Sequence, residues 1–343
     1  MNVSSRSSSN ITHLTRADTA LNKSGPRSNG FSDWWISGNA EAAILLTLSL
    51  VVILSNGVTI VTTLFSKKLK MQFHYWFIFN LALTDFLFGF IIQIEAFDSL
   101  VTMPKEVCSI SIIALHSLSI LTLLGTAMLS LNKYIQLFYP FHYPFLITGP
   151  RLIGVFATTW LGVFSLLIGI EVASHDDHYK KNGECFPLPA NIKISPDVYN
   201  VYLTFALVLY VLPLLIISYT NIRITRLVRE HTRRMRNQIV DQEQASQNGL
   251  GLNKKDLNAI KTALVIVLTF LCMWLPYYTS TIFRGYCGSC VAMNAFSVTR
   301  LLSFLNSAVN PILYGFDKTF RTSCKNVFLR LDNTSTNTQT SNS

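Results

Sequence analysis

Seven long apolar stretches constrain this chain more than any other feature. The hydrocarbon core of a bilayer is about 30 Å thick, so a helix that crosses it needs about 20 predominantly apolar residues. Two of the seven stretches hold one charge each, Asp85 in 71–94 and Arg300 in 291–316. The other five contain no Asp, Glu, Lys or Arg and comprise residues 42–65, 107–131, 152–170, 198–222 and 262–283. The pattern predicts an all-α membrane protein, a seven-transmembrane helix bundle followed by a short amphipathic helix.

The distribution of charge orients this bundle. Only 13% of the residues are charged, roughly half of what a soluble domain carries, yet the net charge is +10. Eighteen of the 28 Lys and Arg residues fall on the segments of one side, where there are only six acids. Because cytoplasmic loops are rich in Lys and Arg, the N-terminus is expected outside and the C-terminus in the cytosol. The basic excess therefore suits anionic lipid, and we expect no nucleic-acid partner.

Four segments follow from this organisation. Residues 1–39 are expected to form an extracellular tail with glycosylation sequons at Asn2, Asn10 and Asn22, and residues 40–316 the bundle. Apolar side chains close to a 3/4 spacing predict an amphipathic helix on the inner membrane surface over 317–331. Its Cys324 is a candidate for lipidation, with a free thiol as the alternative. Residues 332–343, rich in Ser, Thr and Asn, are expected to be a disordered cytoplasmic tail.

Four cysteines lie on the predicted outer side. Cys108 opens the third span and Cys185 lies in the outer loop 171–197. Because both face an oxidising compartment, a disulfide between them is expected. Cys287 and Cys290 form a CxxC in the last outer loop, and with no second CxxC a small disulfide is favoured over zinc.

Several polar residues lie within the predicted spans. Asp85 lies in the middle of the second span, and a lone carboxylate at that depth needs partners. Candidate partners are Asn56, Asn306, Ser307 and Asn310, either as a structural hydrogen-bond network or as a cation or water site. Elsewhere, Trp274, Tyr277 and Tyr278 flank Pro276 and predict an aromatic cluster at a kink.

The chain resembles the rhodopsin-like (class A) G-protein-coupled receptors. The resemblance covers about residues 40–331 and no particular subfamily. Matching residues occur in order along the seven stretches: Asn56, Leu81-Ala82-Leu83-Thr84-Asp85, Cys108, Trp160, Cys185, Pro213, Phe270 with Trp274-Leu275-Pro276, and Asn310-Pro311-Ile312-Leu313-Tyr314 followed by Phe320. The resemblance implies a non-enzymatic receptor of the plasma membrane that binds an extracellular ligand and activates a heterotrimeric G protein. Arrestin and a receptor kinase are further implied partners.

The resemblance also implies a sodium site and an activation switch. The sodium pocket of the family matches Asp85, Thr122, Asn306, Ser307 and Asn310; no other cofactor or metal is expected. Residues matching the switch are Asn132, Lys133, Tyr134, Asp256, Phe270, Pro311 and Tyr314. This chain departs from the family at Asn132-Lys133-Tyr134, where Asp/Glu-Arg-Tyr is usual, and Lys lacks the planar fork of Arg. A Lys133–Asp256 pair is the expected substitute lock, and basal activity is expected to be altered.

The identity of the ligand is the most open question. Aminergic members of the family carry an amine-binding Asp at the position that Leu115, beside His116, occupies here. Retinal-binding members carry a Lys at the position of Phe304. Glu95 and Arg300 are interpreted as pocket charges that hold a peptide or zwitterion, the alternative being an internal ion pair. We favour a neuropeptide or other peptide ligand over an amine- or nucleoside-like small molecule. The predicted pocket comprises Glu95, Leu115, His116, Ser119, Phe186, Trp274, Tyr277, Tyr278, Arg300 and Phe304.

Three other function classes were weighed against a working receptor. A channel or transporter would need a continuous polar path, and the charges at depth are confined to Asp85, Glu95 and Arg300. An enzyme is disfavoured because the chain contains no HExxH or GxSxG motif. A receptor-fold protein with impaired coupling stays open because of Asn132-Lys133.

Overall fold

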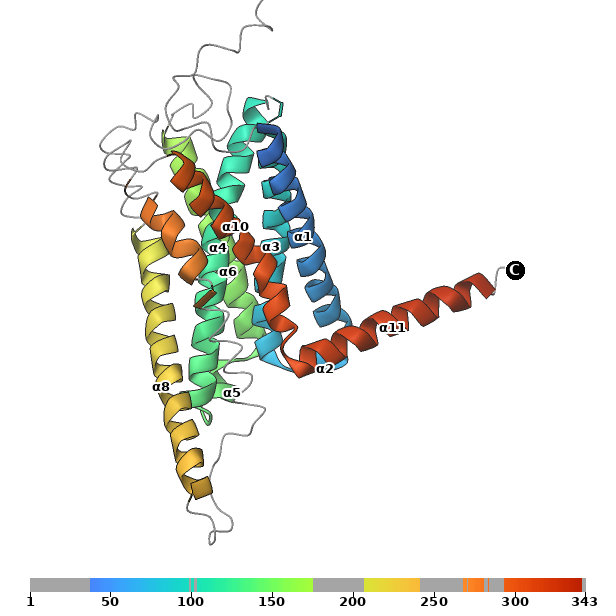
Figure 1. Ribbon diagram of the computed structural model, residues 1–343, viewed down its shortest axis with the longest axis vertical. Helices are drawn as coiled ribbons and strands as arrows, with labels where there is room; N and C mark the ends of the chain where they lie inside the picture. The colour runs from blue at the N-terminus through green and yellow to red at the C-terminus, as the bar shows by residue number, and fades with distance from the viewer. Residues whose placement is uncertain are drawn as a thin grey trace, which may run out of the picture. The chain divides into compact units, whose positions relative to one another are not determined.

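The structure is a computed structural model that describes residues 38–98, 100–101, 104–174, 207–240, 268–269, 271–280, 283 and 293–340. All of these belong to one compact unit within residues 38–343. Every regular element in this part of the chain is a helix (Figure 1). This architecture agrees with the predicted all-α class.

Six long helices make up most of the described bundle. They are α1 (Gly38–Phe65), α3 (Phe73–Asp98), α4 (Lys105–Phe138), α6 (Gly149–Ser174), α8 (Leu212–Val240) and α10 (Met293–Tyr314). Two four-residue helices, α2 (Lys67–Lys70) and α5 (Tyr143–Leu146), lie in the connections on the predicted inner side. Residues 271–280 are also helical, and α11 (Lys318–Thr340) follows α10.

Five of the described helices are long and apolar enough to cross a membrane. They are α1, α3, most of α4 and α6, and the segment Val208–Leu227. The other two predicted spans correspond to the helical residues 271–280 and to α10, which carries Arg300 and several amides. α4 and α8 both continue beyond their apolar stretches. Once a helix has formed, each added residue contributes a further backbone hydrogen bond, so charged residues can prolong it.

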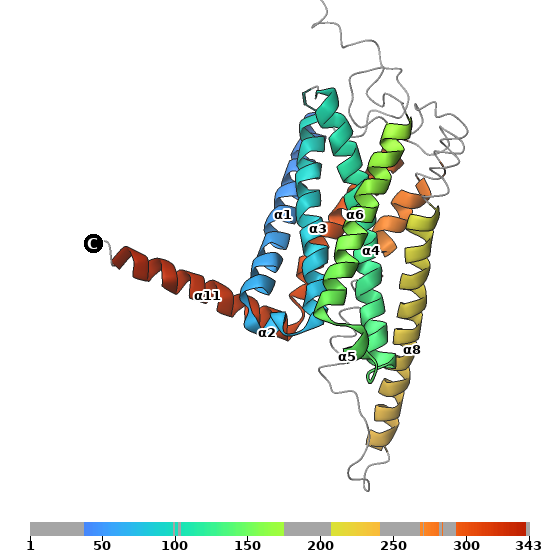
Figure 2. The same ribbon diagram turned by 180° about the vertical axis from the view of Figure 1, so that it is seen from behind.

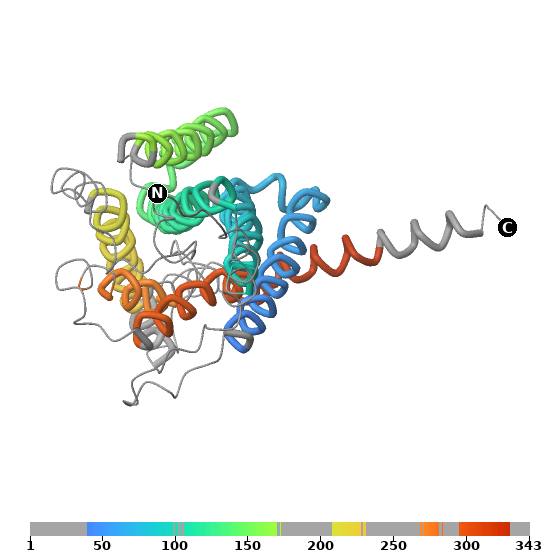
Figure 3. The backbone as a smooth tube through the Cα atoms, turned by 90° about the horizontal axis from the view of Figure 1, so that it is seen from above, coloured from blue at the N-terminus to red at the C-terminus, as the bar shows by residue number. Residues whose placement is uncertain are grey.

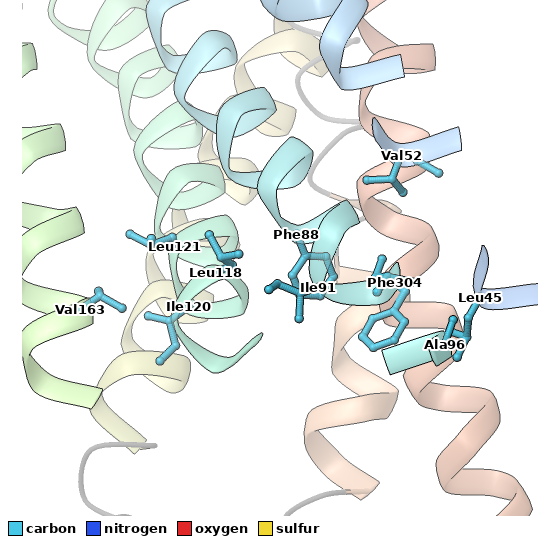
Figure 4. Packing of buried hydrophobic residues seen from close by; sticks show 12 residues of the cluster. Leu45, Val52, Phe88, Ile91, Ala96, Leu118, Ile120, Leu121, Val163 and Phe304 are labelled. Carbon is cyan, nitrogen blue, oxygen red and sulfur yellow. The ribbon is translucent and has the colours of Figure 1, made fainter. Parts of the chain in front are cut away.

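Helix α4 packs against three of the other long helices. α4 contacts α3, α6 and α8, while α1 contacts α3 and α10 (Figures 2 and 3). The largest buried apolar cluster joins Leu45 and Val52 of α1 to Phe88 of α3, Leu118 of α4 and Phe304 of α10 (Figure 4). The Phe88 and Phe304 rings meet edge to face at 5.4 Å between centroids. With Val163 of α6 as a further member, this cluster holds five helices together.

Helices α1 and α3 pack closely against each other at Gly89. A Cβ atom on Gly89 would lie 2.6 Å from Cγ1 of Ile53 and 3.2 Å from Cγ1 of Val52. Real Cβ contacts are not that short, so glycine is required for this packing. Small residues at such crossings let membrane helices approach closely.

Large apolar side chains on the outside of the bundle face away from the protein. Leu54 is 68% exposed and Ile153 is 72% exposed, and α6 is the least buried of the five apolar helices. In a bilayer these side chains contact lipid tails, which are as apolar as the side chains themselves. Their exposure is therefore a property of a membrane protein and carries no penalty there.

Two prolines mark local departures from a regular α-helix. A five-residue π-helical turn, η3 (Leu207–Val211), precedes α8, whose second residue is Pro213. Proline lacks the backbone N–H that an α-helix would use, and π-turns commonly accommodate such a defect. Pro311 lies inside α10, near its inner end.

α11 is held against the inner end of the bundle by Asp317. Tyr75 of α3 donates its hydroxyl to Asp317 Oδ2 at 2.7 Å, and the Thr319 backbone N–H donates to Asp317 Oδ1 at 2.7 Å. Phe320 and Val327 are buried, while Phe328 is exposed, which agrees with an amphipathic helix.

The helix α11 is longer than the amphipathic helix predicted from the sequence. It was expected over 317–331 with a disordered tail from 332, but the structure continues it as far as Thr340. The Ser, Thr and Asn residues that led to the prediction have only modestly poor helix propensity. An existing helix can therefore extend through them without an apolar face.

Candidate functional site

A carboxylate at the centre of the bundle forms the first candidate site. Asp85 of α3 is fully buried and accepts three hydrogen bonds. Thr122 of α4 and Ser307 of α10 donate their hydroxyls to Oδ1 at 3.1 Å and 2.8 Å. Asn310 donates its amide to Oδ2 at 2.9 Å. Four of the five residues matched to the sodium pocket are thus brought together from three helices.

Two further amides border this carboxylate. Asn56 of α1 donates to the Ser307 backbone carbonyl at 2.9 Å, which ties α1 to the same point of α10. Asn306, the fifth predicted member, is fully buried, and its side-chain oxygen and nitrogen both lack a hydrogen-bond partner among the described residues. A carboxylate with neighbouring hydroxyl and amide oxygens is the donor set that a hard cation prefers. The residues present therefore fit Na⁺.

The second candidate site is an ion triad near the outer ends of α1, α3 and α10. Arg300 Nη1 forms an ion pair with Glu95 Oε1 at 2.5 Å, and Nη2 donates to Glu41 Oε1 at 2.6 Å. The exposed fractions of the side chains are 4% for Glu95, 17% for Arg300 and 31% for Glu41. The internal ion pair weighed as an alternative for Glu95 and Arg300 is therefore present. Glu41 was missed because it lies just before the first charge-free stretch.

The predicted aromatic cluster forms beside this triad. Trp274 is buried and stacks on Tyr278 at 5.3 Å between ring centroids, and Tyr278 contacts Tyr210 at 4.5 Å. Tyr277 lies 6.2 Å from the Trp274 ring and 5.7 Å from Phe296 of α10. Trp274 and Tyr278 also pack against Leu123, Ala127 and Ile217 of α4 and α8. Aromatic side chains thus connect residues 271–280 with Tyr210 of η3 and with Phe296 of α10.

The pocket residues predicted on α4 make mostly local contacts. Ser119 donates its hydroxyl to the Leu115 carbonyl at 2.7 Å, and His116 Nδ1 lies 2.9 Å from the Ile112 carbonyl oxygen. Leu115 packs at the edge of the largest apolar cluster, to which Phe304 also belongs. Leu115 and Phe304 are therefore held as packing residues in this structure.

The inner end of α4 carries the unusual Asn132-Lys133-Tyr134 sequence. Tyr143 of α5 donates its hydroxyl to Asn132 Oδ1 at 3.0 Å, so the amide takes over the acceptor role that a carboxylate would have. Burial raises the pKa of Tyr143 above its ordinary value, so the phenol stays protonated and acts as the donor. Lys133 is only 6% exposed, and its Nζ lies 3.4 Å from Gln136 Oε1. Tyr134 stacks on Phe138.

The inner end of α10 places Tyr314 in the core. Its side chain is 2% exposed and its ring lies 6.2 Å from that of Phe320, one turn into α11. Pro311 lies three residues before it inside the same helix. Cys324 of α11 is a partly exposed free thiol. Pro311 and Tyr314, which match the activation switch expected from the resemblance, thus follow Asn310 of the Asp85 network along α10.

One polar contact between α4 and α8 was missed from the sequence. Ser130 Oγ lies 2.8 Å from Thr220 Oγ1 and also accepts a hydrogen bond of 2.8 Å from the Asn221 amide. The pairing of Asn221 with Ser130 depends on the register of two helices about 90 residues apart in the chain.

Several predictions fall on residues outside the described ranges. Cys108 is disulfide-bonded, and Cys185, its expected partner, lies outside the described residues. The predicted members that lie outside these ranges are Asn2, Asn10, Asn22, Cys185, Phe186, Asp256, Phe270, Cys287 and Cys290.

Comparisons with known proteins agree with this architecture. Residues 55–314, well over half of the chain, match the family of the 7 transmembrane receptor (rhodopsin family). The chain therefore belongs to the rhodopsin-like (class A) family of G-protein-coupled receptors. Membership confirms the seven-helix prediction and places the chain among multi-pass membrane receptors that are not enzymes.

Individual relatives are distant. The chain is 29% identical over 294 residues to the histamine H2 receptor of Cavia porcellus, a match that covers 84% of this chain and 79% of that receptor. It is 27% identical over 234 residues to the adenosine receptor A2a of Canis lupus familiaris, covering 64% of this chain and 55% of the relative. The D(1B) dopamine receptor of Xenopus laevis is 26% identical over 232 residues, covering 58% of this chain and 49% of the relative.

Proposed function

We propose that this protein is a plasma-membrane receptor that converts the binding of a small extracellular molecule into activation of a heterotrimeric G protein. Family membership supports the receptor and its coupling to a G protein. The relatives compared above are named as receptors for histamine, dopamine and adenosine, all of them small molecules. A small-molecule ligand is therefore favoured over the peptide expected from the sequence.

The Glu95–Arg300 ion pair is the observation that carries this choice. The peptide prediction depended on both charges being available to hold the termini or charged side chains of a ligand. In the structure each charge has the other as its partner at 2.5 Å, and Glu95 is almost completely buried. Separating a buried pair costs several kcal/mol, on the order of 3–5. A ligand that used both charges separately would have to supply that free energy.

The proposed mechanism is a shift between two packings of the same helices. A ligand near Tyr277 and Tyr278 would change how these rings support Trp274, which packs against Leu123 and Ile217. Movement of α8 and of residues 271–280 would then open the inner face, where Lys133 and the basic residues of α8 lie. Na⁺ held by Asp85 and its neighbours would add positive charge beside a buried carboxylate and favour the packing that contains the site.

Nucleotide exchange on a G protein tests this proposal. The full chain in lipid nanodiscs, mixed with purified G proteins, would be exposed to histamine, dopamine, adenosine and related small molecules, and in parallel to a peptide library. We expect exchange to rise with one class of small molecule. Stimulation by peptides alone would refute the small-molecule assignment.

Lys133 provides the test of impaired coupling. Arg in its place restores the planar fork of five N–H donors, so Lys133→Arg is expected to change basal and ligand-stimulated exchange by several-fold. The matched control is Lys68→Arg, which makes the same change at an exposed position on the same side. If both variants behave like the parent protein, Lys133 does not control coupling.

A further inference from the structure

The charges around Arg300 do not balance. One guanidinium meets two carboxylates, those of Glu41 and Glu95. Within this triad of described side chains, two negative charges share one positive charge. The nearest oppositely charged group in the contacts described is Arg300 itself, which both carboxylates already share.

The buried carboxylate is also incompletely bonded. Glu95 is 4% exposed, and its Oε2 has no hydrogen-bond partner among the described residues. An ionised carboxylate accepts about four hydrogen bonds, and leaving one oxygen buried without any is costly. A second cation beside Glu95 would therefore improve both the charge balance and the hydrogen bonding.

The surroundings of the triad suit an organic cation. Phe296 lies one turn before Arg300 on α10, and the Tyr277 ring lies 5.7 Å from the Phe296 ring. Aromatic faces attract ammonium groups and pack well against the apolar body that carries them. Glu41 is 31% exposed, so at least one of the two carboxylates is partly accessible.

We propose that the ligand of this receptor is a small protonated amine whose ammonium group binds the Glu95–Glu41 carboxylates between α1, α3 and α10. This inference rests on the small-molecule function proposed above and specifies its ligand class. It also places the ammonium away from Leu115 of α4, which is uncharged and cannot form an ion pair with it. Arg300 acts as a positioning residue that holds the two carboxylates in place.

Binding of a matched pair of probes tests the site. The full chain in nanodiscs is titrated to millimolar concentrations with phenethylamine and with 2-phenylethanol, in which a hydroxyl replaces the ammonium. Binding is followed as a rise in the unfolding temperature, which any ligand selective for the folded state produces. We expect phenethylamine to stabilise the receptor and 2-phenylethanol to have no effect. Absence of stabilisation by phenethylamine, or equal stabilisation by both probes, would overturn the proposal.

Variants then locate the ammonium. Glu95→Gln is expected to weaken phenethylamine binding at least about tenfold, since a charge-assisted hydrogen bond is lost. Glu41→Gln, at a more exposed position, is expected to weaken it about threefold and provides a readout if Glu95→Gln does not fold. Glu106→Gln removes the same charge from an exposed site at the outer end of α4 and serves as the control. Equal binding by all three variants would overturn the assigned location.

The G-protein assay separates this inference from the proposed function. Stimulation of exchange by adenosine, without stabilisation by phenethylamine, would refute the amine site and leave the small-molecule receptor intact. Stimulation by peptides alone would refute both. Stimulation by an amine that is lost in Glu95→Gln but kept in Glu106→Gln would support both.

Discussion

Replacing Arg300 by Met tests the ion triad without any ligand. The change would leave Glu95, 4% exposed, as a buried carboxylate without a cation. Removing one partner of a buried pair costs about 3–5 kcal/mol. The second contact of Arg300, with the more exposed Glu41, adds at most about 1 kcal/mol because water screens it. We therefore expect Arg300→Met to destabilise the protein by about 3–5 kcal/mol.

The other two corners of a double-mutant cycle make this expectation specific. Glu95→Gln keeps an amide oxygen that accepts from Arg300, and Arg300 still has Glu41 as its counter-ion, so the cost is about 1 kcal/mol. The double variant has no buried unpaired charge at Glu95 and should recover roughly 2–3 kcal/mol of the loss in Arg300→Met. Arg300→Met should therefore be less stable than either Glu95→Gln or the double variant. A purely steric role of Arg300 would not produce this order of stabilities.

The assay is thermal unfolding in nanodiscs of one lipid composition. With roughly 2 °C per kcal/mol for a protein of this size, Arg300→Met should lower the Tm by roughly 6–10 °C. Lys68→Met removes one positive charge from the exposed α2 and should change the Tm by no more than about 1 °C. The reasoning is refuted if Glu95→Gln is as damaging as Arg300→Met, or if the double variant shows the sum of both losses.

Two further predictions concern the bundle and its centre. Gly89→Ala should lower the Tm relative to Gly162→Ala, since a Cβ on Gly89 would lie 2.6 Å from Ile53 whereas one on Gly162 meets no atom within 4 Å. Both changes gain the same helix propensity, so the difference isolates overpacking of about 1–3 kcal/mol; equal Tm values would contradict the close α1–α3 crossing. Replacing K⁺ in the buffer with Na⁺ at constant ionic strength should raise the Tm of the parent protein but not that of Asp85→Asn. If Asp85→Asn keeps the response, Na⁺ does not bind at this carboxylate.

The predicted ligand charges show how far sequence reasoning reaches. Glu95 and Arg300 were identified because ionisable residues are rare in apolar stretches, and this signal is local. Whether they pair depends on the distance between α3 and α10, about 200 residues apart in the chain. Glu41, which completes the triad, had no local signal because it lies in the first turn of α1, where acids are common.

The sequence by itself determined the class of fold and the orientation expected in the membrane. Only a helix satisfies its own backbone hydrogen bonds within a short segment, so long apolar stretches specify spans without knowledge of distant contacts. Lys and Arg between the stretches orient those spans for a similarly local reason. Asp85 stood out on its own, because no carboxylate is placed at such depth without partners.

Only the tertiary structure decided which polar groups meet. It brought Thr122, Ser307 and Asn310 to Asp85, paired Glu95 with Arg300, and joined Ser130 to Asn221. Hydrogen bonds and ion pairs act over about 3 Å, so they depend on the rotation and register of each helix. These are set by close packing between neighbours, as at Gly89, and not by the apolar character of any one stretch.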